Sequence, residues 1–166
     1  MAKKIPSSFD RWSDNVVRRL TMLFVGAVLV NYPWERLQSS FYVHPGGVGI
    51  PWWLCLAASL ADGLFILMIF GVGWMALGRR TWFEQPGIEG YLVMLASGVA
   101  ISVGVEWMSV HVLRWWSYGE RMPLVPIVDV GLVPLIQMLV LPPLIFRIVA
   151  IVSRYVDGMR ARAYGP

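Results

Sequence analysis

Long hydrophobic runs dominate the chain and are separated by short polar segments. The runs cover approximately residues 20–34, 51–77, 88–113 and 124–152. A helix of about 20 residues crosses a hydrocarbon core of about 30 Å, and the runs lack the period-two alternation that is typical of a transmembrane barrel. The pattern therefore predicts an all-α fold, a polytopic transmembrane four-helix bundle that forms one integral membrane domain over residues 1–166.

The composition agrees with this class of protein and excludes several others. Hydrophobic residues make up 57% of the chain and charged residues only 14%, whereas soluble domains carry about 25% charged residues. Cys55 is the only cysteine and lies inside an apolar run. A disulfide scaffold and a metal site built from thiolates are therefore excluded.

Basic residues are distributed unequally between the two sides of the predicted membrane. Of the 14 lysine and arginine residues, 11 fall on the side that carries both termini, and the other side has only Arg36, Arg114 and Arg121. Because cytoplasmic segments carry the excess of basic residues, both termini are expected to face the cytoplasm from the cell inner membrane. The basic amphipathic stretch 1–19 and the basic tail 153–166 are expected to lie along the anionic inner leaflet. These charges match no nucleic-acid-binding module, so nucleic acid is not an expected partner.

Two acidic side chains lie well inside the predicted spans, where an ionisable group is costly and is usually functional. Asp62 comes 11 residues after Pro51, which places it roughly 16 Å into the membrane at about 1.5 Å per helical residue. Glu106 comes eight residues before Arg114, about 12 Å below the outer boundary on the same scale. We predict that Asp62 and Glu106 are catalytic residues that act as proton donor and acceptor.

Other polar residues of the outer half are predicted to line a ligand pocket that opens toward the outer leaflet. Three of them, at the end of the first run, follow the helical spacing i, i+4, i+7, and Pro33 among them is expected to kink the helix. Asp129 is expected just inside the fourth helix, with Gln137 two turns later on a similar face. The inner half offers no comparable polar set. The predicted pocket residues are Asn31, Glu35, Gln38, His111, Tyr118, Asp129 and Gln137.

Structural roles for the same side chains are the alternative. Glu106 would then pair with Arg114, and Glu35 with Arg36 or with the more distant Arg121. Asp129 would cap the start of a helix. Under this interpretation the polar residues stabilise the bundle and have no ligand.

Metal binding is a further use for several carboxylates. They could hold a hard divalent cation, and His111 would admit a transition metal. No His-x-x-x-His or Glu-x-x-His motif is present, so no metal site is predicted. No motif identifies a cofactor.

Several short motifs lie between residues 31 and 143. They are Asn31-x-x-Trp34-Glu35-x-x-Gln38-x-x-x-Tyr42, Asp62, Glu106, Trp116-x-Tyr118-x-x-x-Met122-Pro123, Gly131-Leu132-x-Pro134-x-x-Gln137 and Pro142. As a set they resemble the motifs of a known group of proteins. That group consists of small four-helix bacterial inner-membrane proteins without an assigned function, so the resemblance implies a location and no chemistry. A more distant similarity is to the lycopene cyclases and carotenoid hydratases, which place acidic residues and Trp/Tyr motifs on transmembrane helices for proton chemistry on polyenes. No residue is assigned from them.

Three classes of function fit these features. The first is an enzyme or binding protein for a lipid-like ligand, isoprenoid or acyl, that uses acid/base chemistry in the membrane. The second is an accessory or assembly subunit with a membrane-complex partner. The third is a small proton-coupled transporter, for which four helices are few unless the chain forms a homo-oligomer. Membrane lipid is a partner in all three.

Overall fold

The computed structural model of the chain describes residues 8–43 and 49–163, with side chains described over residues 15–43 and 49–162. The first residues of the predicted basic stretch 1–19, with Lys3 and Lys4, and the end of the tail 153–166 lie outside the described residues. Within them the chain is mostly helical. The four long helices are α1 (Ser8–Gln38), α2 (Trp52–Leu77), α3 (Gly87–Trp107) and α4 (Leu132–Ala163).

Each long helix contains a segment that is long and apolar enough to cross a membrane. These candidate spans are Asn15–Phe41, Trp52–Leu77, Gly87–Val112 and Leu132–Arg162. Large apolar side chains remain exposed on every helix, for example Leu29, Leu64, Leu92 and Ile151, as expected for helices that face lipid rather than water. The predicted four-helix protein with four candidate membrane-spanning helices is confirmed.

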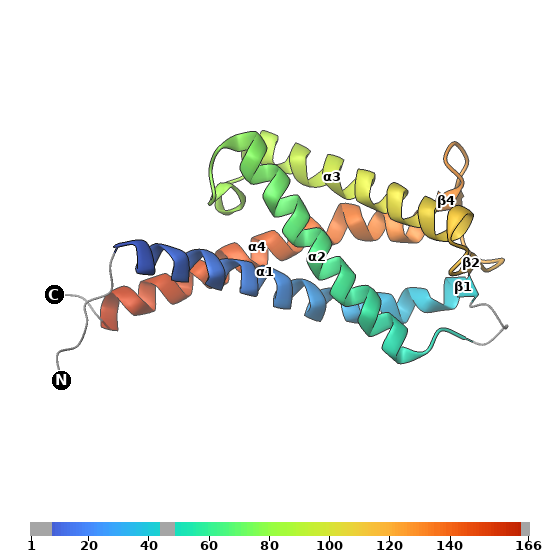
Figure 1. Cartoon of the computed structure of the whole chain (residues 1–166), viewed down its shortest axis with the longest axis horizontal. Helices are drawn as coiled ribbons and strands as arrows, with labels where there is room; N and C mark the ends of the chain where they lie inside the picture. The colour runs from blue at the N-terminus through green and yellow to red at the C-terminus, as the bar shows by residue number, and fades with distance from the viewer. Residues whose placement is uncertain (1–7, 44–48, 164–166) are drawn as a thin grey trace.

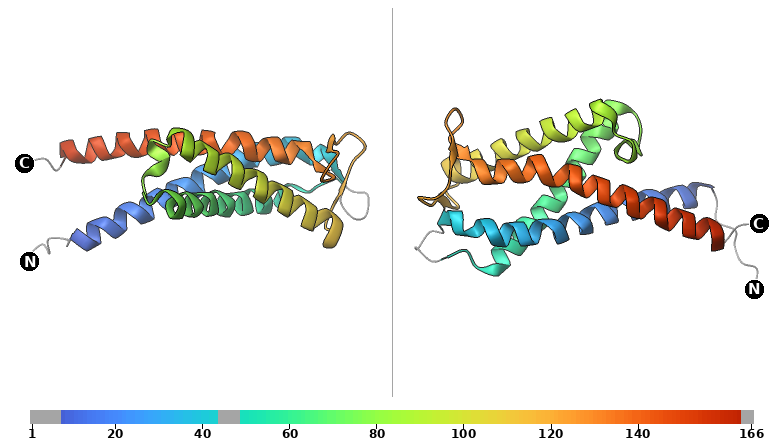
Figure 2. Two further views of the ribbon diagram at one scale, coloured as in Figure 1. Left: turned by 90° about the horizontal axis from the view of Figure 1, so that it is seen from above. Right: turned by 180° about the vertical axis from the view of Figure 1, so that it is seen from behind.

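The helices form one elongated bundle (Figures 1 and 2). α1 and α4 run in opposite directions, so both ends of the described chain lie at the same end of the molecule, which we call the termini end. α1 packs against α2 and α4, and α3 packs against α4 and α2. α2 and α3 meet near their connection and diverge toward the other end of the bundle (Figure 1), which we call the far end.

Short elements close the far end. A turn of 3-10 helix, η1 (Ser39–Phe41), follows α1 and leads into β1 (Tyr42–Val43), which pairs antiparallel with β2 (Ser117–Tyr118). A second pair is formed by β3 (Leu124–Val125) and β4 (Val130–Gly131). A π-helical turn, η3 (Met108–Val112), continues α3. The β1–β2 pair joins the end of α1 to the segment after α3.

The fourth helix begins at Leu132 and not near residue 124 as predicted from the hydrophobic run. Residues 124–131 form the β3–β4 hairpin instead, because Pro126 interrupts helical bonding and Asp129 adopts a left-handed conformation with φ 50°. Asp129 therefore lies in the turn of this hairpin, before the helix rather than inside it. The first helix is longer than predicted and continues past Pro33 to Gln38.

The connection between α2 and α3 folds back into the core near the termini end. It contains a 3-10 turn, η2 (Trp82–Glu84), and its Trp82 side chain is fully buried. The Trp82 indole N–H donates to the carbonyl oxygen of Phe70 at 3.1 Å, and its ring centroid lies 5.3 Å from that of Phe146 on α4. This aromatic contact ties α2, α4 and the connection together. The core cluster consists of Leu23, Ala27, Ile66, Ile69, Phe70, Trp82, Phe83, Met94, Leu141, Ile145, Phe146, Val149 and Ala150.

Small residues allow close contact between α3 and α4 on one face of α3. Gly98 and Ser102 are buried, and a Cβ atom at Gly98 would lie 2.3 Å from the backbone oxygen of Met138. The other row of small residues on α3, which includes Ala100 and Gly104, is exposed. Only the first row therefore mediates helix packing within the chain.

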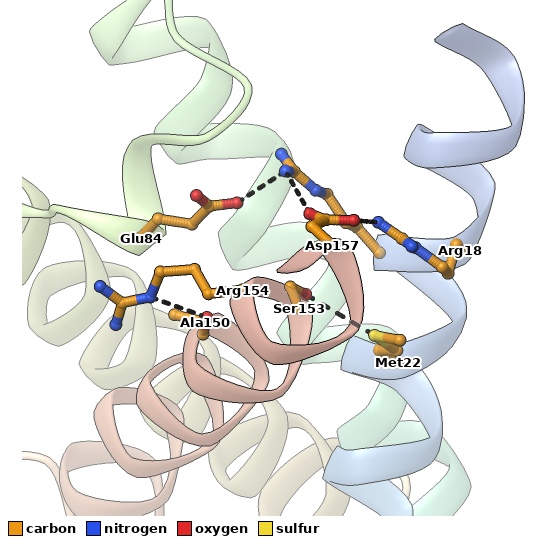
Figure 3. Close-up of polar contacts among 8 residues, drawn as sticks. Arg18, Met22, Glu84, Ala150, Ser153, Arg154 and Asp157 are labelled. Carbon is orange, nitrogen blue, oxygen red and sulfur yellow. Dashed lines mark hydrogen bonds and ion pairs between the residues drawn. The ribbon is translucent and has the colours of Figure 1, made fainter. Parts of the chain in front are cut away.

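A charged cluster joins three elements at the termini end (Figure 3). Arg18 on α1 forms an ion pair with Asp157 on α4. Arg19 lies 2.9 Å from Glu84 of η2 and 3.7 Å from Asp157. Charges from α1, α4 and the α2–α3 connection, which are far apart in the sequence, thus meet in the folded structure.

Candidate functional site

The side-chain amide of Gln137 lies at the centre of a buried polar cluster. Its Nε2 atom is 2.9 Å from Asn31 Oδ1, 2.9 Å from Glu35 Oε1 and 3.0 Å from Asp62 Oδ2. Gln38 Nε2 in turn donates to Gln137 Oε1 at 2.9 Å and to Glu35 Oε1 at 2.6 Å. We call these five residues, which come from α1, α2 and α4, the amide cluster.

The amide cluster has more acceptors than donors. A glutamine amide carries two hydrogens, yet three oxygens lie within hydrogen-bond distance of Gln137 Nε2. Gln38 cannot supply the missing donor to Asp62, because its own hydrogens go to Glu35 and Gln137. Two carboxyl groups are thus held close together with too few donors for both, in a site where Asp62 is only 7% exposed. This arrangement favours a proton shared between Glu35 and Asp62.

Glu106 on α3 is held by two tyrosines. Tyr42 Oη donates to Glu106 Oε1 at 3.1 Å, and Tyr118 Oη donates to Glu106 Oε2 at 2.8 Å. The two tyrosines are register partners in the β1–β2 pair, which is why hydroxyls from distant parts of the sequence reach one carboxyl group. We call these three residues the Glu106–tyrosine cluster.

Both tyrosines stay protonated at neutral pH. Burial raises the pKa of Tyr42 above its usual value, and the nearby charge of Glu106 raises it further. Burial and the same carboxylate also raise the pKa of Tyr118. A phenol with a raised pKa keeps its hydrogen, so both hydroxyls remain donors to Glu106.

A cavity of about 630 Å³ brings the two clusters together. Glu35, Gln38, Asp62 and Gln137 line it from one cluster, and Glu106 and Tyr42 line it from the other. Most of the remaining wall is apolar and comes from the diverging helices α2 and α3. Ligand pockets have this character, with apolar walls and a few polar groups that orient the ligand. The apolar wall includes Leu54, Ala57, Ala58, Ala61, Phe65, Ile101, Val105 and Met138.

The end of α3 shapes the rim of the cavity. The π-helical turn η3 keeps Ser109 buried in the cavity wall, and such turns are frequent at functional sites. Arg114 follows in a left-handed conformation with φ 53°, which is uncommon for a residue other than glycine. Arg114, Trp115 and Trp116 then complete the rim.

Most of the predicted site residues come together here. Asp62, Glu106, Glu35, Gln38 and Gln137 line the cavity. Asn31 and Tyr118 do not line it but hydrogen-bond to residues that do. All four helices thus contribute polar groups, as the sequence predicts.

His111 and Asp129 lie apart from the cavity. Both are exposed, and His111 Nε2 lies 3.1 Å from the backbone oxygen of Asp129. The helix after Glu106 turns His111 to another face, and the β3–β4 hairpin carries Asp129 away. These two residues are therefore not part of the pocket.

The alternative ion pairs do not form over the part of the chain that the structure describes. The ion pairs found there are those of the charged cluster at the termini end, so neither Glu35 nor Glu106 is paired with an arginine. The same part of the chain holds no group of three His, Cys, Asp or Glu residues that could bind a metal ion. The buried carboxyl groups are stabilised by amides and phenols instead.

Several cavity residues were not predicted as site residues by the sequence analysis, and Arg114 was considered only as an ion-pair partner of Glu106. Tyr42 belongs to one of the motifs, but nothing in the sequence places it opposite Glu106. Ser102 is one small residue among many in an apolar run, and no motif singles it out. Trp116 is typical of an interfacial tryptophan. No strong sequence signal identifies these residues, because the role of each depends on contacts that form only in the folded protein.

Comparison with known proteins adds no relative. No protein-family model, curated protein or solved structure matches the chain. The structure itself defines a four-helix protein with four candidate membrane-spanning helices and a cavity that has mostly apolar walls and a few buried carboxyl groups.

Proposed function

We propose that this protein binds an amphiphilic, lipid-like ligand, isoprenoid or acyl, in the cavity between α2 and α3. The observation that carries the proposal is one cavity that combines apolar walls with buried carboxyl groups from three helices. Ionisable groups are expensive inside a bilayer and are retained mainly for function. The small alanines of α2 leave room beside them for a hydrocarbon chain.

We further propose that the ligand is acted on by acid/base chemistry, with Asp62 and Glu106 as proton donor and acceptor. The two carboxyl groups have different surroundings, because Asp62 shares one amide with Glu35 while Glu106 receives two phenol hydroxyls. Carboxyl groups in different environments differ in proton affinity, which allows one to donate while another accepts.

Blocking the cavity is expected to remove the ligand. Protein extracted from membranes in mild detergent should carry an amphiphile adduct in native mass spectrometry. Ala58→Trp, which places an indole in the cavity wall, should lose at least about 90% of that adduct, because pockets of this kind bury most of their ligand's surface. Ala96→Trp is the matched control, since Ala96 is exposed on α3 and outside the cavity.

Two further variants keep this experiment decisive. If Ala58→Trp fails to fold, Ala61→Phe on the same wall replaces it, and thermal melting in detergent checks each variant. Equal adducts in Ala58→Trp and Ala96→Trp would refute ligand binding in the cavity.

For the chemistry, Glu106→Gln should abolish a change in cellular lipid composition that expression of the native protein produces. Identical lipid profiles would remove the catalytic part and leave the binding part.

We also propose that the protein lies in the cell inner membrane with both termini in the cytoplasm. Arg79, Arg80 and the charged cluster lie toward the termini end, and this excess of arginine favours the cytoplasmic side. In a Cys55→Ala background, Gly49→Cys should react with a membrane-impermeant maleimide in intact spheroplasts. Arg79→Cys should react only after the membrane is opened. The opposite labelling pattern would reverse the orientation.

A further inference from the structure

The carboxyl groups of the cavity already have hydrogen-bond donors. Each oxygen of Glu106 accepts from one tyrosine. Glu35 Oε1 accepts from two amides, and Asp62 Oδ2 accepts from Gln137. Glu106 is therefore satisfied from within the protein, and a proton shared between Glu35 and Asp62 would supply the donor that the amide cluster lacks. Neither cluster then requires a cationic ligand.

The polar groups of the cavity wall that have no hydrogen-bond partner are able to donate. Ser102 Oγ is buried, with the residue 4% exposed, and has no partner among the described residues. The indole N–H of Trp116 is buried as well, and it lies near Glu106 without the geometry of a hydrogen bond. An indole nitrogen can only donate, and a hydroxyl can do so. A ligand group that meets the Trp116 N–H must be an acceptor, and the Ser102 hydroxyl is able to donate to an acceptor as well.

The positively charged guanidinium group of Arg114 lies at the rim of the cavity, on the same segment as Trp116. The Arg114 side chain is exposed, lines the cavity, and makes no hydrogen bond or ion pair with any described residue. Guanidinium groups bind phosphate and carboxylate through paired hydrogen bonds. Trp115, which is 60% exposed, flanks Arg114, in the way that tryptophans sit at the head-group level of a bilayer.

We propose that the ligand carries an anionic head group, phosphate or carboxylate, that binds Arg114 and the Trp116 indole N–H while its hydrocarbon chain occupies the apolar wall. This inference rests on the proposed function and adds the charge of the ligand. Ser102 lies more than two helical turns deeper than Arg114, where a second oxygen of the ligand would meet it. A cationic amphiphile, which the acidic residues alone would suggest, is the class that this arrangement disfavours.

Four probes with the same oleyl chain test the head group. Oleyl phosphate, oleate, oleyl alcohol and oleylamine are titrated into the delipidated protein, and their apparent Kd values are measured by native mass spectrometry. Oleyl phosphate or oleate should bind at least about tenfold more tightly than the alcohol, which is the contribution expected of one charge-assisted hydrogen-bonded pair. The amine should bind no more tightly than the alcohol. The order of the two anions tells a phospholipid-like head from that of a fatty acid.

Arg114→Gln should lower the affinity for the anionic probes about tenfold and leave the affinity for the alcohol unchanged. The substitution adds no backbone strain, because neither residue is glycine. Arg121→Gln is the matched control, since Arg121 is exposed at the same end and does not line the cavity. Equal binding of anions and alcohol, preference for the amine, or equal effects of the two substitutions would overturn the head-group inference.

The two proposals fail in different ways. If Ala58→Trp abolishes binding of the alcohol but the native protein shows no preference for an anion, the cavity binds lipid and the head-group inference is wrong. If Ala58→Trp leaves the binding of all four probes unchanged, the cavity is not the binding site and the proposed function is wrong.

Discussion

Replacing Gln137 with leucine is expected to destabilise the folded protein by about 3–5 kcal/mol, the range for breaking a buried charged network. Leucine is similar in size, so little of this loss comes from packing. The buried oxygens of Asn31, Glu35 and Asp62 would all lose the Gln137 donor, and each unsatisfied buried group costs about 1–3 kcal/mol. Equilibrium unfolding in mixed detergent and SDS micelles measures the change.

A matched control separates the loss of the hydrogen-bond network from the general effect of replacing glutamine with leucine. Gln85→Leu makes the same chemical change at an exposed position and should alter stability by less than about 0.5 kcal/mol. Adding Asp62→Asn to Gln137→Leu should recover part of the loss, because the new amide can donate to Glu35. A loss for Gln137→Leu no larger than that for Gln85→Leu would show that the amide cluster does not stabilise the bundle.

The second large effect is expected at Gly98. A methyl group there would meet the backbone oxygen of Met138 at 2.3 Å, and a backbone atom cannot move without separating α3 from α4. We expect Gly98→Ala to destabilise the protein by about 1–3 kcal/mol, the range for overpacking a well-packed contact. The same detergent unfolding experiment measures it.

Gly104 on the same helix provides the comparison. A methyl group at Gly104 meets no atom within 4 Å, and alanine is a better helix former than glycine by about 1 kcal/mol. Gly104→Ala should therefore be neutral or slightly stabilising. If the two substitutions had equal effects, close contact between α3 and α4 at Gly98 would be refuted.

The hydrophobic pattern predicts the helices well where polar or turn-forming residues end each run. The second and third runs, 51–77 and 88–113, nearly coincide with the spans Trp52–Leu77 and Gly87–Val112. The fourth run fails at its start because residues 124–131 are as apolar as a helix but pair as strands. The hydropathy of a short apolar segment does not distinguish a hairpin from a turn of helix.

The candidate site is predictable to the extent that it depends on the cost of polar groups in a membrane. That cost singles out Asp62 and Glu106, and it correctly suggests that polar groups from the four helices meet. The partners are not predictable, because the Tyr42–Glu106 contact depends on the β1–β2 pair, whose strands are far apart in the sequence. The position of Asp129 depends on a local turn that no period in the sequence encodes, whereas the five-residue step from Glu106 already turns His111 to another face of the helix.

The divergence of α2 from α3 bears on which concentration of ligand, in water or in the membrane, would determine the occupancy of the cavity. The cavity lies between these two helices, and under the proposed function its ligand reaches it from the acyl-chain region of the bilayer. A ligand that enters sideways is already concentrated by partitioning into the membrane. Occupancy would then follow the mole fraction of the ligand among the surrounding lipids, and a weak intrinsic affinity would suffice to fill the site.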